Sequence, residues 1–410
     1  MSAIVIQGET AAMSVGQRFL RRRVLDSMAG MREGRLVITD ALGRVEIGQP
    51  LQERPAIVVH LHVRDPRFYA AVATNGSIGA GEAWMENYWQ CDDLVALIRL
   101  LVRNRNHLDA METGLARLGG TAMRCWHAMR PNTRSGARRN IAAHYDLGNE
   151  FFDLFLSSDL MYSSALWEDD DDTLELASKR KLDRVCQWLD LKPGDNVMEI
   201  GTGWGGFAIH AARHYGCHVT TTTISKEQHA LASERVARAG LGGQVSLLLE
   251  DFRDLTGRYD KLVSIEMIEA IGAANMDGYF SKIGALLRPR GRALLQAITI
   301  EDHRYAQALK SVDFIKRHVF PGSFIPSISA MMASKARSSE LALVRQEDFG
   351  LSYARTLQAW RERFMAFLPQ VRAMGYDERF VRMWEFYLSY CEGGFRERSI
   401  GVSHLLFEQA

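Results

Sequence analysis

A glycine-rich loop at 199–206, with the sequence Glu-Ile-Gly-Thr-Gly-Trp-Gly-Gly, constrains the fold more than any other segment. The apolar stretch before it, 196–198, is typical of a strand, and the stretch after it, 207–215, is typical of a helix. Glycines at such a turn let a ligand approach the backbone, and the helix start presents free N–H groups. A turn that binds nothing is the alternative, but its four glycines cost backbone entropy without packing. We therefore predict a strand–turn–helix unit that binds a nucleotide-like ligand.

The position of the nearest acid distinguishes two classes of nucleotide site. Gly201, Gly203 and Gly206 fit the G-x-G-x-x-G pattern of dinucleotide sites, which also has an acid about 20 residues later, at the end of the second strand. The predicted second strand, 217–223, ends in four threonines and contains no acid. Glu199 instead ends the first strand, as is typical of S-adenosylmethionine (SAM)-dependent methyltransferases, in which this acid faces the methionine amino group. The loop favours SAM, with an NAD-dependent oxidoreductase as the alternative.

Length and charge exclude some functions. The 410 residues suggest two or three domains, and a net charge of +1 gives no reason to expect a nucleic-acid partner. Arginines gather at 18–35 and 124–139, which is typical of a solvated surface and also of attraction to anionic lipid. The five cysteines form no C-x-x-C pair, so we expect neither a disulfide framework nor a metal site, in a reducing cytoplasm. No apolar run approaches the roughly 18 residues that span a bilayer.

The order of the elements predicts an α/β fold. Residues 1–120 are predicted to form a small α+β domain, followed by a basic linker at 121–140. Residues 141–410 alternate strands with helices, as in the seven-stranded, Rossmann-like sheet of class I SAM-dependent methyltransferases, with a helical insertion at about 301–340. The seven strands are expected at 196–200, 217–223, 245–249, 261–265, 293–298, 341–345 and 400–407, the last antiparallel.

Within the small domain, strands are expected at 35–40 and 56–63, because both stretches are β-branched and bounded by glycine or proline. Residues 76–81 are predicted to form a glycine-rich turn, and 84–89 and then 94–102 are predicted to be amphipathic helix.

Several longer motifs follow one another along the chain. They are His-Tyr-Asp-Leu-Gly-Asn at 144–149, Met-Tyr-Ser-Ser-Ala-Leu-Trp at 161–167, Thr-Ile-Ser-Lys-Glu-Gln at 223–228, Met-Ile-Glu-Ala-Ile-Gly at 267–272 and Phe-Pro-Gly at 320–322. Together they resemble the cyclopropane fatty acyl phospholipid synthases and their relatives, the mycolic acid cyclopropane synthases. The stretches at 76–85 and 88–94 resemble the N-terminal lipid-engaging domain of the bacterial phospholipid enzymes. The resemblance covers essentially the whole chain and is specific to the family, though not to one product.

The resemblance implies a reaction and its partners. In that family a cis double bond within a phospholipid acyl chain attacks the sulfonium methyl of SAM, the resulting cation loses a proton, and a cyclopropane ring closes. A bicarbonate ion held in the pocket is thought to take the proton. The implied partners are therefore SAM, bicarbonate and an unsaturated phospholipid. The implied state is a cytoplasmic homodimer that associates peripherally with the inner face of the membrane.

The resemblance also implies the cofactor residues. Those expected around the methionine part are Glu199, Gly201, Gly203 and Gly205, with Tyr162 and Ser163 at a lid. Those expected at the ribose are Thr223, Ile224 and Gln228, and Asp251 and Phe252 are expected to flank the adenine. The alternative for these ribose and adenine residues is an ordinary structural role, as a strand end, a helix cap or a core aromatic.

The implied anion ligands depart from the family pattern. Glu269, the backbone of Ile298 and Tyr353 fall where the family places bicarbonate ligands. Ser164 and Gln296 stand where the cyclopropane synthases have cysteine and histidine. Both can donate hydrogen bonds, but neither titrates near neutral pH as histidine does. Methyl transfer without ring closure, giving a methyl-branched or methylene chain, is therefore an alternative, as is a lipid-binding protein without catalysis.

A basic segment at 314–325 allows two interpretations. Apolar residues at 314, 315, 319, 320, 324 and 325 lie on both sides of Lys316, Arg317 and His318. A membrane-facing patch would have this composition, and so would a buried insertion helix.

Overall fold

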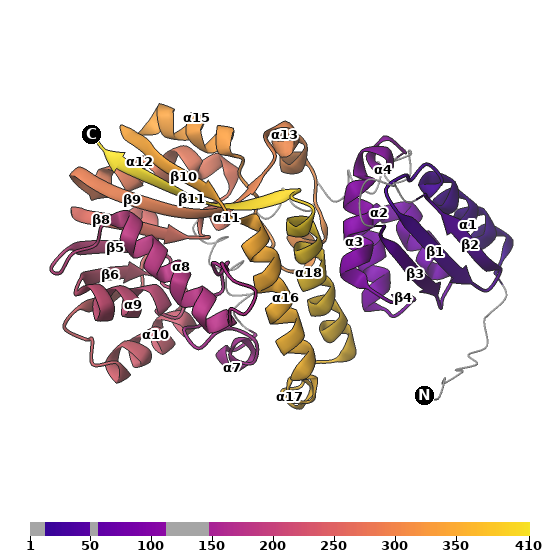
Figure 1. The fold of residues 1–410 in the computed structure, drawn as a ribbon, viewed down its shortest axis with the longest axis horizontal. Coiled ribbons are helices and arrows are strands. Elements are labelled where there is room, and N and C mark those ends of the chain that lie inside the picture. Colours follow the sequence, from indigo (N-terminus) through magenta and orange to yellow (C-terminus); the bar gives the residue numbers. More distant parts are fainter. Residues whose placement is uncertain (1–12, 50–55, 112–146) are drawn as a thin grey trace. The chain divides into compact units, whose positions relative to one another are not determined.

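A seven-stranded sheet organises residues 147–374 and 398–410 in the computed structural model (Figure 1). The strand order is β10-β11-β9-β8-β5-β6-β7, and β11 (Ile400–Gln409) runs antiparallel to both of its neighbours. The pairs β5–β6, β6–β7, β5–β8 and β8–β9 are all parallel. The predicted class I methyltransferase sheet and its reversed last strand are thus confirmed.

The structure describes residues 13–49, 56–111 and 147–410. The predicted linker and the motif residues 144–146 lie outside these ranges. The elements of the methyltransferase unit are α7 (Asn149–Asp153), α8 (Leu174–Leu189), β5 (Asn196–Ile200), α9 (Gly206–Tyr215), β6 (His218–Thr222), α10 (Lys226–Arg238), β7 (Val245–Leu248), β8 (Tyr259–Ile265), α11 (Ile268–Ile271), α12 (Met276–Leu286), β9 (Leu287–Ile300), α13 (Asp302–Lys310), α14 (Phe314–His318), α15 (Ile328–Ser338), β10 (Leu341–Asp348), α16 (Gly350–Ala366), α17 (Leu368–Ala373) and β11.

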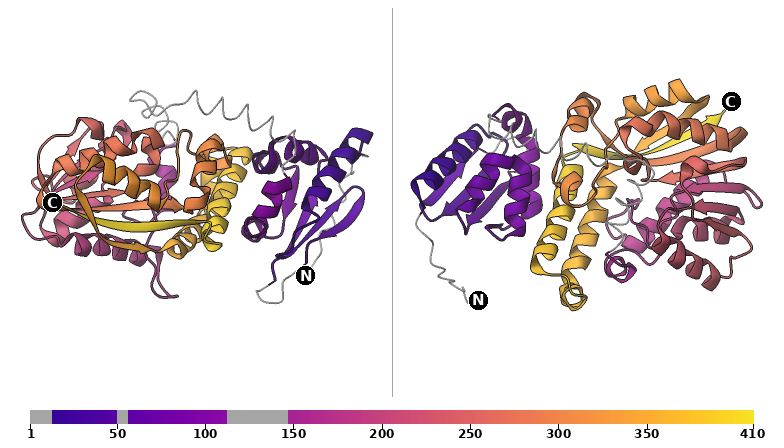
Figure 2. Two further views of the ribbon diagram at one scale, coloured as in Figure 1. Left: turned by 90° about the horizontal axis from the view of Figure 1, so that it is seen from above. Right: turned by 180° about the vertical axis from the view of Figure 1, so that it is seen from behind.

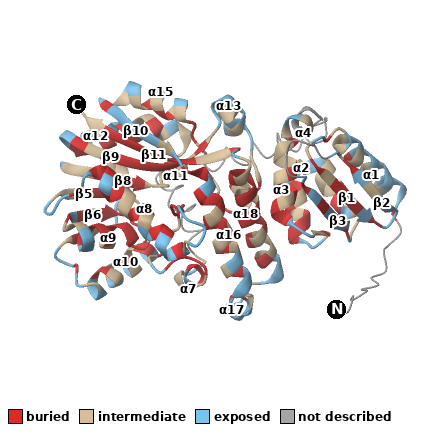
Figure 3. Cartoon of the chain, viewed as in Figure 1, coloured by how far each residue is buried: buried red, intermediate tan, exposed pale blue. Residues whose placement is uncertain are grey.

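Helices cover both faces of this sheet (Figures 1 and 2). Successive residues of β5 point to opposite faces, as the pleat of a strand requires. Val197 packs with Leu182 of α8 and Phe207 of α9, whereas Met198 packs with Phe280 of α12. The central parts of β5, β8 and β9 are therefore buried from both sides (Figure 3), which explains the apolar runs in these strands.

The second unit comprises described residues up to 111 together with 375–397. Its four-stranded sheet has the order β2-β1-β3-β4. On β3, Val59, Leu61 and Val63 are buried while His60 and His62 are exposed, so one face packs and the other meets solvent. Its elements are α1 (Val15–Met28), β1 (Arg35–Asp40), β2 (Gly43–Ile47), β3 (Val58–Val63), α2 (Arg67–Met85), β4 (Trp89–Cys91), α3 (Leu94–Arg103), α4 (Arg105–Met111) and α18 (Glu378–Arg396).

Helix α18 changes the predicted domain boundary. The sequence prediction assigned all of 141–410 to the methyltransferase domain, but residues 375–397 belong to the N-terminal unit. Trp84 of α2 donates its indole N–H to the carbonyl of Arg382 at 3.0 Å, and the Arg382 guanidinium lies 4.0 Å from the Trp84 ring. Arg99 and Arg103 of α3 bind Glu397 at 2.7 and 2.8 Å. These contacts attach a late segment of the chain to the first domain.

The predicted turn at 76–81 and helix at 84–89 are wrong. Helix α2 continues through 76–81, and only Gly76 leaves the helical region, with φ of 55°. Gly79 lies so close to the helix backbone that a Cβ there would be 1.9 Å from the carbonyl oxygen of Ala71. The glycines thus allow a kinked, tightly packed helix, and Trp89 already begins β4.

The membrane-facing interpretation of 314–325 is also wrong. Phe314, Val319 and Phe324 are buried. The Lys316 ammonium is buried as well and donates to the carbonyl oxygens of Ala308 and Ser311 at 2.6 and 3.0 Å. The segment is therefore part of the packed insertion. Within the described ranges, every helix is too short or too polar to cross a bilayer.

Candidate active site

The glycine loop joins β5 to α9 at the carboxyl end of the parallel strands. Gly201, Gly203 and Gly205 have φ of 103°, 52° and 85°, where a side chain would be strained. The N–H groups of Gly201 and Thr202 donate to the carbonyl of Thr222 at 3.1 and 2.9 Å, which fixes the loop to the end of β6. Open α/β sheets bind their ligands at this edge.

Glu199 lies beneath this loop with one oxygen unused. Its side chain is buried, and Oε2 has no hydrogen-bond partner among the described residues. Burial raises the pKa of Glu199 to about 8, against the effects of a Thr221 hydrogen bond and the Lys181 charge. Lys181 is also fully buried; its ammonium donates to the Ser163 hydroxyl at 2.9 Å, and burial lowers its pKa to about 8. A buried acid with an unpartnered oxygen can receive a cationic ligand group.

The predicted ribose residues lie at the end of β6 and the start of α10. The Thr223 hydroxyl donates to Gln228 Oε1 at 2.8 Å, and both side chains are buried. Ser225 caps α10 by accepting the Gln228 backbone N–H at 3.2 Å. Ile224 between them is only partly buried. The cap therefore holds Gln228 beside the strand end.

The predicted adenine residues have other partners. Asp251 accepts two hydrogen bonds from the Arg253 guanidinium, at 2.7 and 2.6 Å. The Phe252 ring packs edge-on against Tyr279, with 5.6 Å between ring centroids. Both residues follow β7 on the ligand side of the sheet, and their role at the adenine stays a prediction.

Aromatic rings surround Tyr162. Its ring centroid lies 5.2 Å from that of Phe152, 5.3 Å from that of Trp360 and 6.4 Å from that of Phe320. The Tyr353 ring meets Trp360 edge-on at 6.1 Å. The negative faces of such rings stabilise a cation that has left water.

Three of the predicted anion-site residues, Ser164, Gln296 and Tyr353, converge on Glu266, which the sequence prediction did not include. Its Oε1 accepts the Ser164 backbone N–H at 2.9 Å and the Gln296 side-chain N–H at 2.8 Å. Its Oε2 accepts the Tyr353 hydroxyl at 2.7 Å. The Ser164 hydroxyl donates instead to the carbonyl of Ala165, so the residue contributes its backbone N–H rather than its side chain.

Glu269 and Ile298 form a separate pair. The Ile298 backbone N–H donates to Glu269 Oε1 at 2.6 Å. Glu269 Oε2 is buried and has no partner among the described residues. Burial, helped by the charge of Glu266, raises the pKa of Glu269 to about 8, so this acid is largely protonated at neutral pH.

His404 of β11 orients the Gln296 side chain through a contact with its amide oxygen. Its Nε2 lies 2.9 Å from Gln296 Oε1, and burial lowers the pKa of His404 to about 3. A neutral imidazole that donates to the amide oxygen directs the amide N–H groups toward Glu266. The sequence prediction missed His404 because register, not local pattern, places it opposite Gln296.

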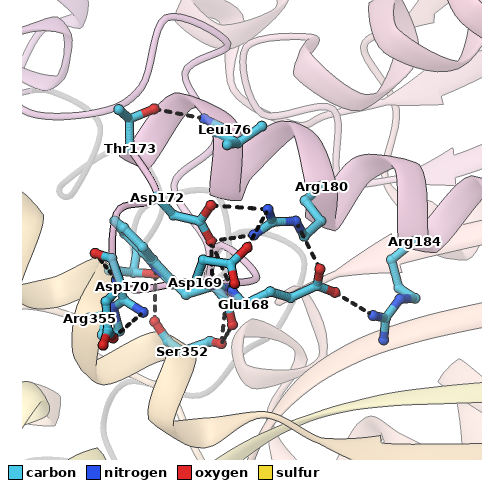
Figure 4. A network of polar contacts seen from close by, with 12 residues as sticks. Glu168, Asp169, Asp170, Asp172, Thr173, Leu176, Arg180, Arg184, Ser352 and Arg355 are labelled. Atoms are coloured by element: carbon cyan, nitrogen blue, oxygen red, sulfur yellow. Dashed lines mark hydrogen bonds and ion pairs between the residues drawn. The ribbon is translucent and has the colours of Figure 1, made fainter.

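An acidic turn fixes one end of the segment that presents Ser164 (Figure 4). Asp172 accepts the backbone N–H groups of Glu168 and Asp169 at 2.9 and 3.0 Å. Arg180 of α8 pairs with both Asp172 and Glu168, and Arg184 binds Glu168 at 3.0 Å. The guanidinium of Arg180 lowers the pKa of Asp172, so this contact persists across the neutral range.

Helix α16 holds the other side of the same segment. Ser352 accepts the Trp167 backbone N–H at 3.1 Å, and Thr356 accepts those of Ala165 and the Trp167 indole at 3.1 and 2.9 Å. Arg355 lies over the Trp167 ring at 4.5 Å. The segment 163–167 is thereby fixed between two helices, which sets the position of the Ser164 N–H.

The residues fit SAM and do not fit bicarbonate. The glycine loop, the unused oxygen of Glu199 and the aromatic cluster supply what a nucleoside with an ammonium and a sulfonium requires. Of the groups that the resemblance assigned to bicarbonate, Ser164, Gln296 and Tyr353 bind Glu266 and Ile298 binds Glu269. Their donors are therefore directed at protein carboxylates.

Comparison with known proteins agrees with this site. The sequence pattern of the family described as mycolic acid cyclopropane synthetase matches residues 132–405. The chain is 35% identical to a tuberculostearic acid methyltransferase of Mycobacterium tuberculosis, over 98% of this chain and 92% of that protein. It is 37% identical to the cyclopropane-fatty-acyl-phospholipid synthase of Escherichia coli K12, over 85% and 87%.

A solved structure with the same fold contains a bound cofactor product. The mycolic acid cyclopropane synthase CmaA1, complexed with S-adenosylhomocysteine (SAH) and CTAB, superposes with a TM-score of 0.62 at 30% identity, covering 66% of this chain and 98% of that one. The chain therefore belongs to the mycolic acid cyclopropane synthetase family, and it is a SAM-dependent methyltransferase that acts on lipids.

Proposed function

We propose that this enzyme methylates a cis double bond in an acyl chain of a membrane phospholipid and closes a cyclopropane ring. The observation that carries the proposal is a carboxylate, Glu266, held by three donors beside a SAM loop and aromatic rings. An alkene is a poor nucleophile, so the reaction needs a dry site that aligns it with the methyl group and tolerates a cation. The buried groups described above meet these requirements.

SAM supplies an electrophilic methyl group on a positively charged sulfur. Glu199 binds the ammonium of its methionine part through the unused Oε2, and the glycine loop admits the backbone of that part. Thr223 and Gln228 bind the ribose.

The π electrons of the alkene form a bond to the methyl carbon while the C–S bond breaks, which leaves a carbocation in the acyl chain. Tyr162, with its aromatic neighbours, stabilises this cation through its ring face. Loss of a proton from the new methyl group lets that C–H electron pair close the ring.

A second candidate function ends without a ring. The near full-length similarity to a tuberculostearic acid methyltransferase favours it, as do Ser164 and Gln296 in place of cysteine and histidine. Here a hydride moves from the methyl-bearing carbon to the cationic carbon and a proton then leaves the methyl group, which gives a methylene chain, or a proton leaves a chain carbon, which gives a methyl-branched chain that keeps a double bond. Both candidates share the methyl transfer and differ in the fate of the cation.

Mass spectrometry of lipids distinguishes these candidates. Cells that express the chain should contain phospholipids heavier by one carbon and two hydrogens, and ozonolysis should find no remaining olefin in them. The same mass gain with an olefin retained would favour the second candidate. No mass gain with any unsaturated phospholipid would contradict both and would favour a lipid-binding protein without catalysis.

The N-terminal unit offers a surface suited to the lipid substrate. On α1, Val15 and Phe19 are 85% and 61% exposed, and Arg18 and Arg22 lie beside them. An apolar and basic helix face of this kind binds an anionic bilayer surface. This face supports peripheral association with the inner membrane leaflet. The homodimer stays a prediction from the family resemblance.

Replacing Lys181 with methionine should weaken SAM binding at least tenfold at pH 7. Lys181 lowers the pKa of both Glu199 and Glu266, so its loss raises the pKa of Glu199 further above 8 and makes the ionisation that SAM binding requires more costly. Calorimetric titration with SAM at pH 7 and pH 9 measures the effect. The deficit should shrink at pH 9, because the wild-type lysine, with a pKa of about 8, has itself lost most of its charge there. Lys192→Met, at an exposed lysine, is the matched control, and equal affinity of the Lys181 variant and wild type at pH 7 would contradict the prediction.

A further inference from the structure

Glu266 is held in a backbone conformation that side chains other than glycine rarely adopt. Its φ is 49°, directly after the last residue of β8. Its backbone N–H still donates to the carbonyl of Gln296 at 2.8 Å and so continues the pairing with β9. Such a conformation is strained for a residue with a Cβ, so surrounding contacts must hold it. Residues of this kind gather at functional sites.

The contacts that hold Glu266 come from three separate elements. Ser164 belongs to the segment before α8, Gln296 to β9 and Tyr353 to α16. These are three of the groups that the family resemblance assigns to a bound bicarbonate. Bicarbonate and carboxylate present the same planar pair of oxygens to their donors. The side chain of Glu266 therefore fills the position that the external anion was expected to fill.

We propose that the Glu266 carboxylate is the base that removes the proton from the carbocation, so that this enzyme needs no bicarbonate. The inference rests on the proposed methyl transfer to an alkene. In the step, a C–H bond of the new methyl group breaks and its electron pair forms the C–C bond between the methyl carbon and the cationic carbon. An oxygen of Glu266 forms a bond to the proton. The proton passes to water when the product leaves, and no oxidant or further reactant is required.

Glu269 is the other carboxyl group nearby, and its surroundings suit it less to this role. Glu266 accepts three hydrogen bonds, which stabilise its ionised form, whereas Glu269 accepts one backbone hydrogen bond. Lys181 also favours the ionised form of Glu266, although burial raises the pKa of that group. Glu269 is predominantly protonated at neutral pH. Two acids whose environments differ in this way take different roles: Glu266 accepts a proton, and Glu269 offers a hydroxyl.

The arrangement also explains the departures from the family pattern. The Glu266 carboxylate is covalently attached to the backbone and occupies one fixed position. Its hydrogen-bond donors therefore need only match that position. Ser164 can replace cysteine because the backbone N–H makes the contact, and its hydroxyl turns away. Gln296 can replace histidine because its amide donates to Glu266 while His404 holds the amide oxygen.

The test compares wild type with Glu266→Gln and Glu266→Gly in carbon dioxide-free buffer. Transfer of labelled methyl from SAM to vesicles of unsaturated phosphatidylglycerol is measured with and without added bicarbonate. Wild type should change less than twofold. Glu266→Gln, of equal size but unable to take a proton, should lose at least about a hundredfold in rate. Glu266→Gly should lose as much and recover at least tenfold with bicarbonate or formate, which can enter the vacated space. Glu234→Gln, at an exposed glutamate, is the control.

A binding measurement separates failure of this inference from failure of the proposed function. Line broadening of ¹³C-bicarbonate, measured by NMR without SAM or lipid, should be seen with Glu266→Gly and absent with wild type. A wild type that binds bicarbonate and loses more than tenfold in rate without it would overturn the inference, and so would a Glu266→Gln variant that keeps more than a tenth of the wild-type rate. If wild type methylates no unsaturated lipid, the proposed function fails, and the NMR result alone still decides whether Glu266 occupies the anion position. Melting curves of both variants exclude misfolding as the cause of lost activity.

Discussion

Glu199→Gln should weaken SAM binding about a hundredfold at pH 8 and should abolish the pH dependence of that binding. The ligand-free acid has a pKa of about 8 because it is buried, yet it must be ionised to pair with the SAM ammonium. Below pH 8 each binding event therefore releases a proton from Glu199. The affinity of wild type should rise about tenfold per pH unit between pH 6 and pH 8 and then level off. Removing one partner of a buried charge pair costs about 2–5 kcal/mol, which gives the hundredfold estimate.

Calorimetry in buffers of different ionisation enthalpy tests this directly, because it counts the protons released. Wild type should release close to one proton at pH 7, and the glutamine variant none.

Thermal stability supplies a second measurement. A carboxyl whose folded pKa is raised stabilises the fold at acidic pH and loses this contribution as pH rises toward the folded pKa. The ligand-free variant should therefore melt above wild type at pH 9, and the difference should be smaller at pH 5. Glu408→Gln, near the end of β11, serves as control. A wild-type affinity that is flat from pH 6 to pH 8 would refute the prediction.

The glycine loop shows why much of this fold was predictable from sequence. Its strand, turn and helix are specified locally, by apolar period and by residues that tolerate positive φ. The reversed last strand, in contrast, was expected from the fold class rather than from a local pattern. Helix α18 was assigned to the wrong unit because an amphipathic pattern tells which face is buried but not which partner buries it.

The site shows where sequence reasoning stopped. Glu266 directly precedes the Met-Ile-Glu-Ala-Ile-Gly motif, and its only local signal was an acid at the end of a strand. Its importance comes from Ser164, Gln296 and Tyr353, which lie far apart in the sequence and meet only when the sheet and α16 have formed. Lys181 was missed for another reason. It sits among Lys179, Arg180 and Asp183, so its sequence context is that of a solvated helix face, although its side chain is fully buried.

Gly206→Ala should reduce methyl transfer at least about a hundredfold while leaving the fold intact. Gly206 is the first residue of α9, and a Cβ there would lie 2.7 Å from the carbonyl oxygen of Asp159 and 2.5 Å from the sulfur of Met161. Met161 can turn away, but the backbone at Asp159 cannot move freely. Arg235 donates to its carbonyl at 3.1 Å, and Ser178 donates to its carboxylate at 2.6 Å. The strain should therefore displace the segment that continues to Tyr162 and Ser164.

That displacement would separate the Ser164 N–H from Glu266 and move Tyr162 from its aromatic neighbours. A shift of about 1 Å in positioning groups can cost a hundredfold in rate, whereas overpacking of this size costs about 1–3 kcal/mol of stability. Steady-state rates and melting curves should thus show a large loss of turnover with a moderate loss of stability. Gly278→Ala, in α12, is the matched control, because its Cβ would meet no atom within 4 Å.

The double variant Gly206→Ala/Met161→Ala separates the two contacts. Removing the Met161 side chain relieves the clash with sulfur but leaves the clash with the Asp159 carbonyl. If the backbone contact transmits the strain to Ser164, the double variant should stay as inactive as Gly206→Ala. Recovery of activity would show instead that the flexible methionine was the obstacle. In that case the tight packing of α9 against the Asp159 backbone would have no part in positioning the donor to Glu266.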